Sequence, residues 1–170
     1  MTELEIRVAP RLPRDDRVAL FQFEIDPWSV EDLGLSWREP DLSFGGYVEG
    51  RPVSHVGLLF HPLDLGESQL LVAGISSVIT LPDARGNGYA SQLMRTAVHE
   101  MRSRSANFGV LFCSEKLRPF YASQGWQLFV HPVTITQSTE KIPSPIQIMV
   151  LPLSSATWPD APVDLQSEPW

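Results

Sequence analysis

The sequence predicts an α+β fold, mixed α/β in character, built on one mixed and mostly antiparallel sheet that is flanked by helices. Strand-like runs occur both as pairs joined by a tight turn and on either side of helix-like stretches, so the chain combines hairpins with crossovers. Its 170 residues are 43% hydrophobic and 19% charged, which suffices to bury one core. We therefore expect a single domain over residues 1–170, with a core of about 3–153 and a C-terminal tail of 154–170.

The spacing of apolar residues predicts the order of the elements. Apolar runs that alternate or continue predict strands, and apolar positions three and four residues apart predict helices. A first helix is expected over residues 14–21, after Pro13, and a second from Tyr89 to Arg102. Residues 49–52 join two expected strands as a hairpin. The expected strands are residues 3–8, 42–48, 53–60, 69–81, 108–113, 127–130 and 146–151, with 133–136 as a further candidate.

The most informative segment joins the expected central strand, 69–81, to the helix that begins at Tyr89. It contains Gly86 and Gly88, which carry no Cβ that would keep an anion away from the backbone. The free N–H groups and the positive dipole end of the following helix favour a bound anion, and Arg85 adds a positive charge. The segment therefore predicts a phosphate site. It lacks both the Gly-Lys-Ser/Thr ending of a Walker loop and the third glycine of the dinucleotide fingerprint.

This turn resembles the acyl-CoA loop of the GNAT acetyltransferases, Arg/Gln-x-x-Gly-x-Gly/Ala, which Arg85, Gly88 and Ala90 match. A second signature of that family follows at the expected distance in residues 117–126, a short helix that carries Tyr121 and ends at Gly125. The resemblance is strong over residues 70–130. It implies the GNAT fold with a central sheet of six to seven strands, and an acyltransferase that uses acetyl-CoA as cosubstrate.

The resemblance also implies which residues bind acetyl-CoA. In this fold the central strand diverges from its neighbour near a bulge, and its free edge binds the pantetheine arm, which assigns the backbones of Val78 and Thr80. Gly74, inside this strand, is typical of a bulge or of a close approach to the backbone. The residues expected to bind the cosubstrate are Val78, Ile79, Thr80, Arg85, Gly86, Asn87, Gly88, Tyr89, Ala90, Ser114 and Arg118.

Direct transfer of an acetyl group to an amine requires two proton movements, because the acceptor must lose a proton and the CoA thiolate must gain one. The family places a tyrosine beside the sulfur, and Tyr121 matches it, with an ordinary phenol pKa of about 10. A backbone N–H, that of Val78, is expected to hold the developing oxyanion. Ser76 stands where many GNATs have a glutamate, so Tyr121 and Ser76 are the expected catalytic residues. The base stays open among waters held by Ser76 and Ser77, His61, Asp64, Glu49 and the Trp170 carboxylate.

The resemblance implies an amine acceptor, and we expect a small-molecule primary amine. The net charge of -7 would attract a polyamine-like or aminoglycoside-like cation, or it serves solubility alone. The tail bears Asp164, Glu168 and a final Trp170, and it resembles that of the aminoglycoside 2'-N-acetyltransferases, whose terminal carboxylate and nearby acids reach the drug's amines. In the segment 24–40, which the family folds over the acceptor site, the acidic residues either bind the amine or cap helices and face solvent. These residues are Asp26, Glu31 and Asp32.

Two other functions remain open from the sequence. One is a non-catalytic, acyl-CoA-binding GNAT-like module, which the absence of a glutamate at Ser76 favours. The other is an acetyltransferase that acts on the amine of a protein or of an amino acid.

Composition excludes several classes of partner. A pI of 5.0 without any Lys/Arg-rich block argues against nucleic acid and anionic membranes. No apolar run approaches the roughly 20 residues of a membrane span, and the N-terminus lacks the pattern of a signal peptide, so a cytoplasmic location is expected. The single cysteine, Cys113, is expected to be inert core, and the four histidines lack the spacing of a metal site. A homodimer is left open.

Overall fold

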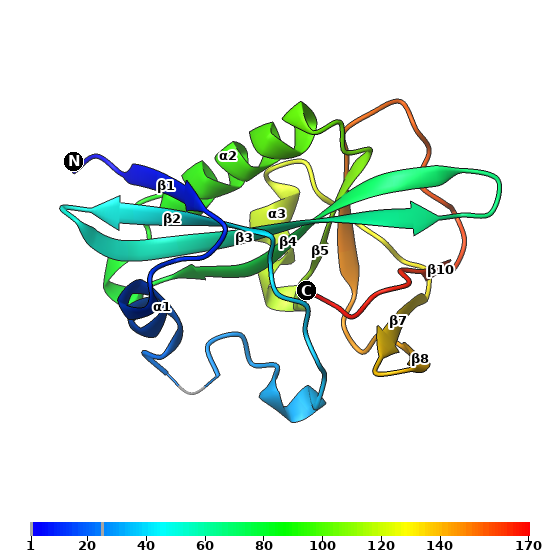
Figure 1. Ribbon diagram of the computed structural model, residues 1–170, viewed down its shortest axis with the longest axis horizontal. Helices are drawn as coiled ribbons and strands as arrows, with labels where there is room; N and C mark the ends of the chain where they lie inside the picture. The colour runs from blue at the N-terminus through cyan, green and yellow to red at the C-terminus, as the bar shows by residue number, and fades with distance from the viewer. Residues whose placement is uncertain (1, 25) are drawn as a thin grey trace.

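A seven-stranded sheet forms the centre of the molecule in the computed structural model, which describes residues 2–24 and 26–170 (Figure 1). Its strands are β1 (Glu5–Ala9), β2 (Leu42–Val48), β3 (Arg51–Asp64), β4 (Gln69–Thr80), β5 (Phe108–Phe112), β6 (Gln127–Leu128) and β9 (Ile148–Pro152). They follow the order β1-β2-β3-β4-β5-β9-β6, and within the described residues only the β4–β5 pair of this sheet is parallel. The predicted class, a mixed and mostly antiparallel α+β sheet of six to seven strands, is confirmed.

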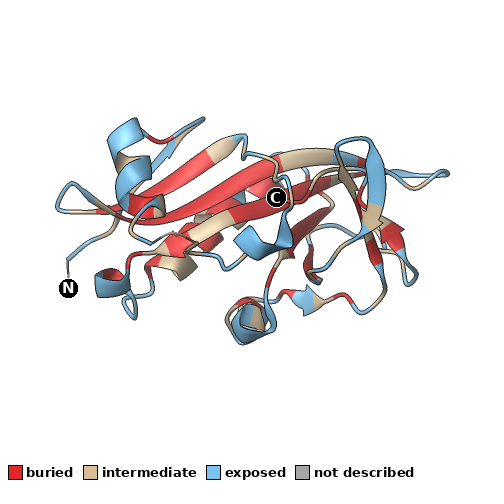
Figure 2. Ribbon diagram, turned by 90° about the horizontal axis from the view of Figure 1, so that it is seen from below, coloured by how far each residue is buried: buried red, intermediate tan, exposed pale blue. Residues whose placement is uncertain are grey.

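Helices cover both faces of this sheet. They are α1 (Arg14–Phe21), α2 (Tyr89–Ser103) and α3 (Arg118–Ala122), with short 3-10 turns η1 (Glu31–Leu33), η2 (Pro82–Ala84) and η3 (Glu115–Leu117). Leu93 and Met94 of α2 pack in one cluster with Val56 of β3, whereas the adjacent His55 packs against Phe21 of α1. Because successive residues of a strand point to opposite faces, α1 and α2 lie on opposite sides of the sheet. Figure 2 shows the buried residues concentrated along the strands between them.

A second, small sheet forms beside the first from the C-terminal part of the chain. It contains β7 (Val133–Gln137), β8 (Glu140–Pro143) and β10 (Val163–Asp164), in the order β10-β7-β8. Residues 133–136 were predicted as a further strand, and they pair here rather than in the central sheet. The strands β8 and β10 escape prediction because they are four and two residues long, too short for a repeating apolar pattern.

The predicted and observed strand ends differ most in β3, which runs to Asp64 instead of residue 60. The sequence argues against this extension because Pro62 lacks the N–H that a strand inside a sheet must donate. In the structure β2 pairs with β3 only as far as Leu58, so Pro62 lies in a portion of β3 that is bonded to β4 alone. A proline is tolerated there because, among the described residues, no strand pairs with that side of β3.

Gly74 allows another side chain to lie directly against the backbone of β4, and it is not the site of the bulge in this strand. The buried indole of Trp170, which is 4% exposed, lies directly on Gly74, and a Cβ added at this glycine would overlap the ring. The indole Nε1–H donates to the carbonyl of Val110 in β5, at 3.1 Å. The tail therefore packs against the sheet, on the face that carries Leu59 and Val72 rather than the α2 face.

We expect Gly74→Ala to lower the free energy of unfolding by about 1–3 kcal/mol, because the new methyl group must displace the Trp170 ring or the strand. In a Trp170→Ala background the same substitution should cost much less, since the obstruction is gone. Chemical denaturation of the wild type, both single variants and the double variant measures this coupling. Strictly additive effects would show that Trp170 does not cover Gly74 in solution.

Among the described residues, no helix is long and apolar enough to cross a membrane.

Candidate active site

The central sheet opens between β4 and β5. The two strands pair from Val72 with Phe108 to Ile75 with Leu111, and beyond Ile75 the strand β4 continues without β5 beside it. A bulge lies next to this point, because one residue of β3, Val56, faces two residues of β4. One of these two, Ser77, has a φ of 49°, a left-handed conformation that is uncommon outside glycine. The end of β4 therefore offers a free edge of backbone groups to a ligand.

The predicted phosphate turn lies at the end of β4, between this strand and α2. Gly86 and Gly88 have φ values of 82° and 75°, and a Cβ added at either would meet nothing within 4 Å. Gly88 is the N-cap of α2, where no side chain caps the first N–H groups of the helix. The amide of Asn87 donates to the carbonyl of Ala84 at 2.9 Å, which holds the turn together. This open cradle of uncapped N–H groups fits the diphosphate of acetyl-CoA.

The carbonyls of Val78 and Thr80 already have side-chain partners. The indole N–H of Trp28 donates to Val78 at 3.0 Å, and Nε of Arg85 donates to Thr80 at 3.1 Å. A carbonyl oxygen has two lone pairs, so each can still accept a second hydrogen bond. The structure thus brings residues 78–80 and 85–90 together at one end of β4.

Ser114 and Arg118 follow β5, on the other side of the opening. Ser114 is exposed at the start of η3, and the Arg118 guanidinium donates to the side chain of Gln147. Their contribution to binding the cosubstrate stays a prediction.

Tyr121 lies in α3 and is 5% exposed, in the cluster that contains Ile75, Met94 and Cys113. Its hydroxyl makes no hydrogen bond with another described residue. Burial raises the pKa of this phenol above its ordinary value, and the neighbouring Cys113 raises it further, so the hydroxyl keeps its proton at neutral pH. Burial also raises the pKa of the Cys113 thiol, which disfavours the reactive thiolate.

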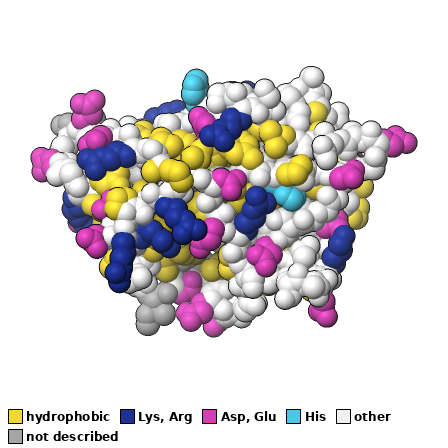
Figure 3. Space-filling model, in the orientation of Figure 1, with side chains coloured by type: hydrophobic (Ala, Val, Ile, Leu, Met, Phe, Trp, Pro, Cys, Tyr) yellow, Lys and Arg dark blue, Asp and Glu magenta, His cyan; other side chains and the backbone are white. Residues whose placement is uncertain are grey.

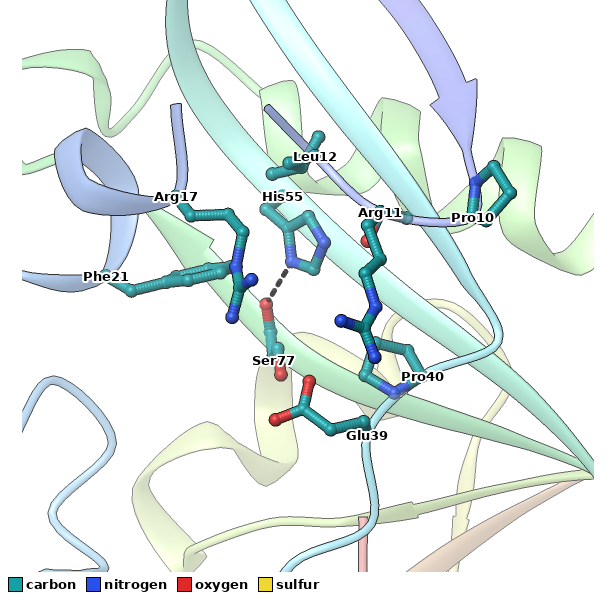
Figure 4. Close-up of a pocket in the computed structure, with 10 residues that line it drawn as sticks. Pro10, Arg11, Leu12, Arg17, Phe21, Glu39, Pro40, His55 and Ser77 are labelled. Atoms are coloured by element: carbon teal, nitrogen blue, oxygen red, sulfur yellow. Dashed lines mark hydrogen bonds between the residues drawn. The ribbon is translucent and has the colours of Figure 1, made fainter. Parts of the chain in front are cut away.

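A small pocket lies on the α1 face, against the bulge of β4 (Figure 4). Arg11 approaches it from the segment before α1, Arg17 from α1 itself, and Glu39 from the segment before β2. In Figure 4 both guanidinium groups and the Glu39 carboxylate point toward the space in front of Ser77. Phe21 and His55 form further parts of the wall. Three charged groups from separate segments of the β1–β2 connection therefore meet beside the opening of the sheet.

His55 is a neutral imidazole in the wall of this pocket. It is 1% exposed, and its Nδ1 lies 2.8 Å from the carbonyl of Ser77. A carbonyl only accepts, so Nδ1 carries the proton and Nε2 carries a lone pair, for which no described residue provides a partner. Burial lowers the pKa of His55 to about 4, against the opposing effect of the Ser77 hydrogen bond, and Arg17 lowers it further.

This depressed pKa predicts a loss of stability in mild acid. The unfolded chain binds a proton at His55 near pH 6.5 and the folded chain only near pH 4, so acid favours unfolding. Stability from this group is complete above about pH 6.5 and falls by roughly 3 kcal/mol as the pH drops to 4. His55→Asn keeps a donor near the Nδ1 position and does not titrate. Denaturation between pH 7 and 4 should show a flatter profile for this variant, and parallel profiles would contradict the assignment.

Three of the bases considered from the sequence lie elsewhere or have no free lone pair. Nε2 of His61 donates to the carbonyl of Leu165 at 2.8 Å, and Nδ1 accepts from Arg38 at 3.2 Å, so both nitrogens are occupied. Asp64 pairs with Gln69 at the closed end of the β3–β4 hairpin. Glu49, in the turn between β2 and β3, lies outside the wall of this pocket.

Two of the acidic residues that were candidates for binding an amine have other partners. The Asp26 carboxylate accepts the N–H groups of Val30 and Glu31 at 3.0 and 2.9 Å, and these bonds lower its pKa, so it caps η1. Asp164 forms an ion pair with Lys141 in the small sheet. Of the two readings given for Asp26, the structure shows the cap.

Ser76 lies in β4 on the face opposite α2, and its catalytic role stays a prediction. Its buried Oγ has no hydrogen-bond partner among the described residues, and a Cβ added at Gly57 would lie 2.5 Å from it. Pro40, which lines the pocket, approaches Gly57 from the same side, so Ser76 lies beside the pocket wall. A water bound to Ser76 would be close to the acceptor.

The sequence did not reveal Arg11, Arg17, Glu39 or His55 as site residues. No motif links them, and only the folding of β1, α1 and β2 around the bulge brings them together. The one signal in the sequence was indirect, because segment 24–40 was expected to fold over the acceptor site. Within the part of the chain that the structure describes, no group of three His, Cys, Asp or Glu residues could hold a metal ion.

The fold and the site together define an acyltransferase, with a free strand edge and a phosphate turn for an acyl-CoA. The family comparison is specific: a model of the GNAT acetyltransferase domain matches residues 34–129. The chain belongs to this family, whose reaction class is acetyl transfer from acetyl-CoA. A search of curated proteins found no significant match.

Solved structures of low sequence identity share the fold. The GNAT family N-acetyltransferase YhbS from Escherichia coli, in complex with CoA, is 19% identical, with a TM-score of 0.62 over 98% of this chain and 91% of that one. An acetyltransferase from Trypanosoma brucei is 21% identical, with a TM-score of 0.55 over 75% and 95% of the two chains. A probable N-acyltransferase from Enterococcus faecalis V583 is 17% identical, with a TM-score of 0.58 over 74% of this chain, which spans only 33% of that longer protein.

Proposed function

We propose that this protein transfers an acetyl group from acetyl-CoA directly to the primary amine of a small molecule. The observation that carries this proposal is the opening between β4 and β5. Tyr121 lies at this opening on the α2 face, and the pocket of Arg11, Arg17 and Glu39 lies beside it on the α1 face. A cosubstrate on one side and an acceptor on the other would meet at the β4 bulge.

Each group in this arrangement has a chemical task. The cosubstrate supplies the acetyl thioester. The turn of residues 85–90 holds its diphosphate, and the free edge of β4 orients its pantetheine arm. The N–H of Val78 donates to the carbonyl oxygen of the acetyl group as negative charge develops on it.

The two proton movements fall to Glu39 and Tyr121. Glu39 accepts the proton that the ammonium group must lose, because its carboxylate points into the pocket without an ion-pair partner among the described residues. As the C–N bond forms and the C–S bond breaks, the hydroxyl of Tyr121 donates a proton to the departing thiolate. Ser76 can hold a water that relays the first proton.

Release of free CoA thiol, measured together with the mass of the acetylated amine, tests this function. We expect both signals only when acetyl-CoA and an amine are present together. Binding of acetyl-CoA without thiol release toward any amine would contradict the proposal and favour the non-catalytic module.

The cytoplasmic location expected from the sequence remains a prediction, and a homodimer remains open.

A further inference from the structure

The charge of the acceptor pocket differs from that of the whole chain. The net charge is -7, yet the pocket contains two arginines and one carboxylate. On the face shown in Figure 3, positive side chains gather with acidic ones over the end of the molecule that carries α1. A polycation attracted by the overall charge would therefore meet two guanidinium groups at the pocket itself.

Neither Arg11 nor Arg17 forms an ion pair within the described part of the chain. Three other exposed arginines do: Arg7 with Glu5, Arg51 with Asp83, and Arg104 with Glu100. In Figure 4 the two free guanidinium groups stand on either side of the space in front of Ser77. Arg17 is also close enough to His55 to lower its pKa. Two unpaired planar donors that face one small space are the arrangement that binds a carboxylate.

The pocket also offers acceptors for an ammonium group. Glu39 enters from the opposite side to the two arginines, with its carboxylate directed at the same space. Nε2 of His55 is a buried lone pair in the wall, with no partner among the described residues. An unpaired buried acceptor is costly unless a ligand or water donates to it. Donors and acceptors therefore line the same small pocket.

We propose that the acceptor is a free amino acid, an amine with a carboxylate on the adjacent carbon. Arg11 and Arg17 bind the carboxylate, and Glu39 and His55 accept hydrogen bonds from the amine. This inference rests on the proposed function, and it replaces a polyamine with a zwitterion as the substrate class. The amine nitrogen forms a bond to the acetyl carbon as the thioester C–S bond breaks. The ammonium group loses two protons in all: Glu39 passes the first to solvent, and the second, released as the amide forms, replaces the proton that Tyr121 donates to the departing thiolate. The products are an N-acetyl amino acid, CoA with its thiol protonated, and one proton in solvent.

Matched pairs of acceptors test the carboxylate directly. The probes are L-phenylalanine against 2-phenylethylamine and L-lysine against cadaverine, which differ only by the carboxylate. We expect the carboxylated member to have a kcat/KM about 10- to 100-fold higher, mainly through a lower KM, because charge-assisted hydrogen bonds bind it. Phosphoethanolamine against ethanolamine tests a phosphate in the same place. A greater gain from phosphate than from carboxylate would overturn the assignment to amino acids.

Variants of the two arginines connect this preference to the pocket. Arg11→Gln and Arg17→Gln should each reduce the ratio of kcat/KM between the paired acceptors by about tenfold. Arg17→Lys keeps the charge but not the planar fork, and it should retain part of the preference. Arg14→Gln is the matched control, because Arg14 is exposed on the same helix but lies outside the wall of this pocket. A ratio that stays unchanged in both Gln variants would overturn the proposal.

Calorimetric titration separates this inference from the proposed function. L-phenylalanine and L-lysine are titrated into the full-length protein with CoA present, so that no turnover is needed. Binding of at least one amino acid that Arg17→Gln abolishes supports the inference even if no acetyl transfer is detected. Acetylation of 2-phenylethylamine or cadaverine without any preference for the amino acids supports the proposed function and contradicts the inference.

Discussion

Replacing Gly88 with alanine is expected to weaken CoA binding by more than about tenfold while the protein stays folded. The residue caps the start of α2 with a φ of 75°, which costs an alanine roughly 1 kcal/mol. Its Cβ would also enter the open space that we assign to the diphosphate, where nothing else lies within 4 Å. Calorimetric titration with CoA measures the effect.

Gly66→Ala is the matched control for this substitution. Gly66 has a φ of 87° and nothing within 4 Å of an added Cβ, but it lies in the turn between β3 and β4, at the closed end of that hairpin. Both variants therefore lose a similar amount of stability, and only Gly88→Ala should lose affinity for CoA. Equal affinities of the two folded variants for CoA would show that the diphosphate does not bind at this turn.

Tyr121→Phe is expected to lower kcat by about 10²- to 10⁴-fold, the range for loss of a general acid, with little change in the affinity for CoA. The ring stays in its buried place in α3, and only the hydroxyl is removed. Because burial raises the pKa of this hydroxyl, the wild-type kcat should not fall with deprotonation of Tyr121 until the pH exceeds the ordinary phenol value of 10. Steady-state kinetics and a pH profile measure both effects.

Cys113→Ala provides the comparison for Tyr121. This thiol lies in the same buried cluster, and direct transfer gives it no task. We expect its kcat to stay within a few-fold of the wild type. A loss as large as that of Tyr121→Phe would indicate that an acyl group passes through Cys113. An unchanged kcat in Tyr121→Phe would show that another group donates the proton to the departing thiolate.

Local patterns in the sequence predicted the conformation of the two segments to which we assign the cosubstrate. The turn of residues 85–90 and the helix of Tyr121 are continuous segments, and the spacing of their glycines and apolar residues reflects the backbone that they form. The central sheet could be predicted for the same reason, since β3 and β4 are long and largely apolar and β5 and β9 are short apolar runs. Short strands such as β10, with two residues, carry no such pattern.

The pocket to which we assign the acceptor could not be predicted because its charged side chains come from separate segments that share no motif. Arg11 and Glu39 stand beside prolines, in segments without a repeating pattern, and they meet only after β1 and β2 have paired. The role of the C-terminal tail could not be predicted from local sequence either. Its acidic residues suggested a substrate site, whereas in the structure Asp164 pairs with Lys141 and the Trp170 indole fills the space above Gly74. Overall charge suggested a cation, but the charge of the pocket depends on which residues the fold places there.

A crystal structure with CoA and an amino acid bound tests most directly whether acetyl transfer takes place at the opening between β4 and β5. We expect the diphosphate on the turn of residues 85–90 and the thiol within hydrogen-bonding reach of the Tyr121 hydroxyl. The carboxylate of the amino acid should lie between Arg11 and Arg17. The amine should then face the thiol across the bulge at Ser77. CoA bound away from β4, or a thiol separated from this pocket by packed side chains, would contradict the account.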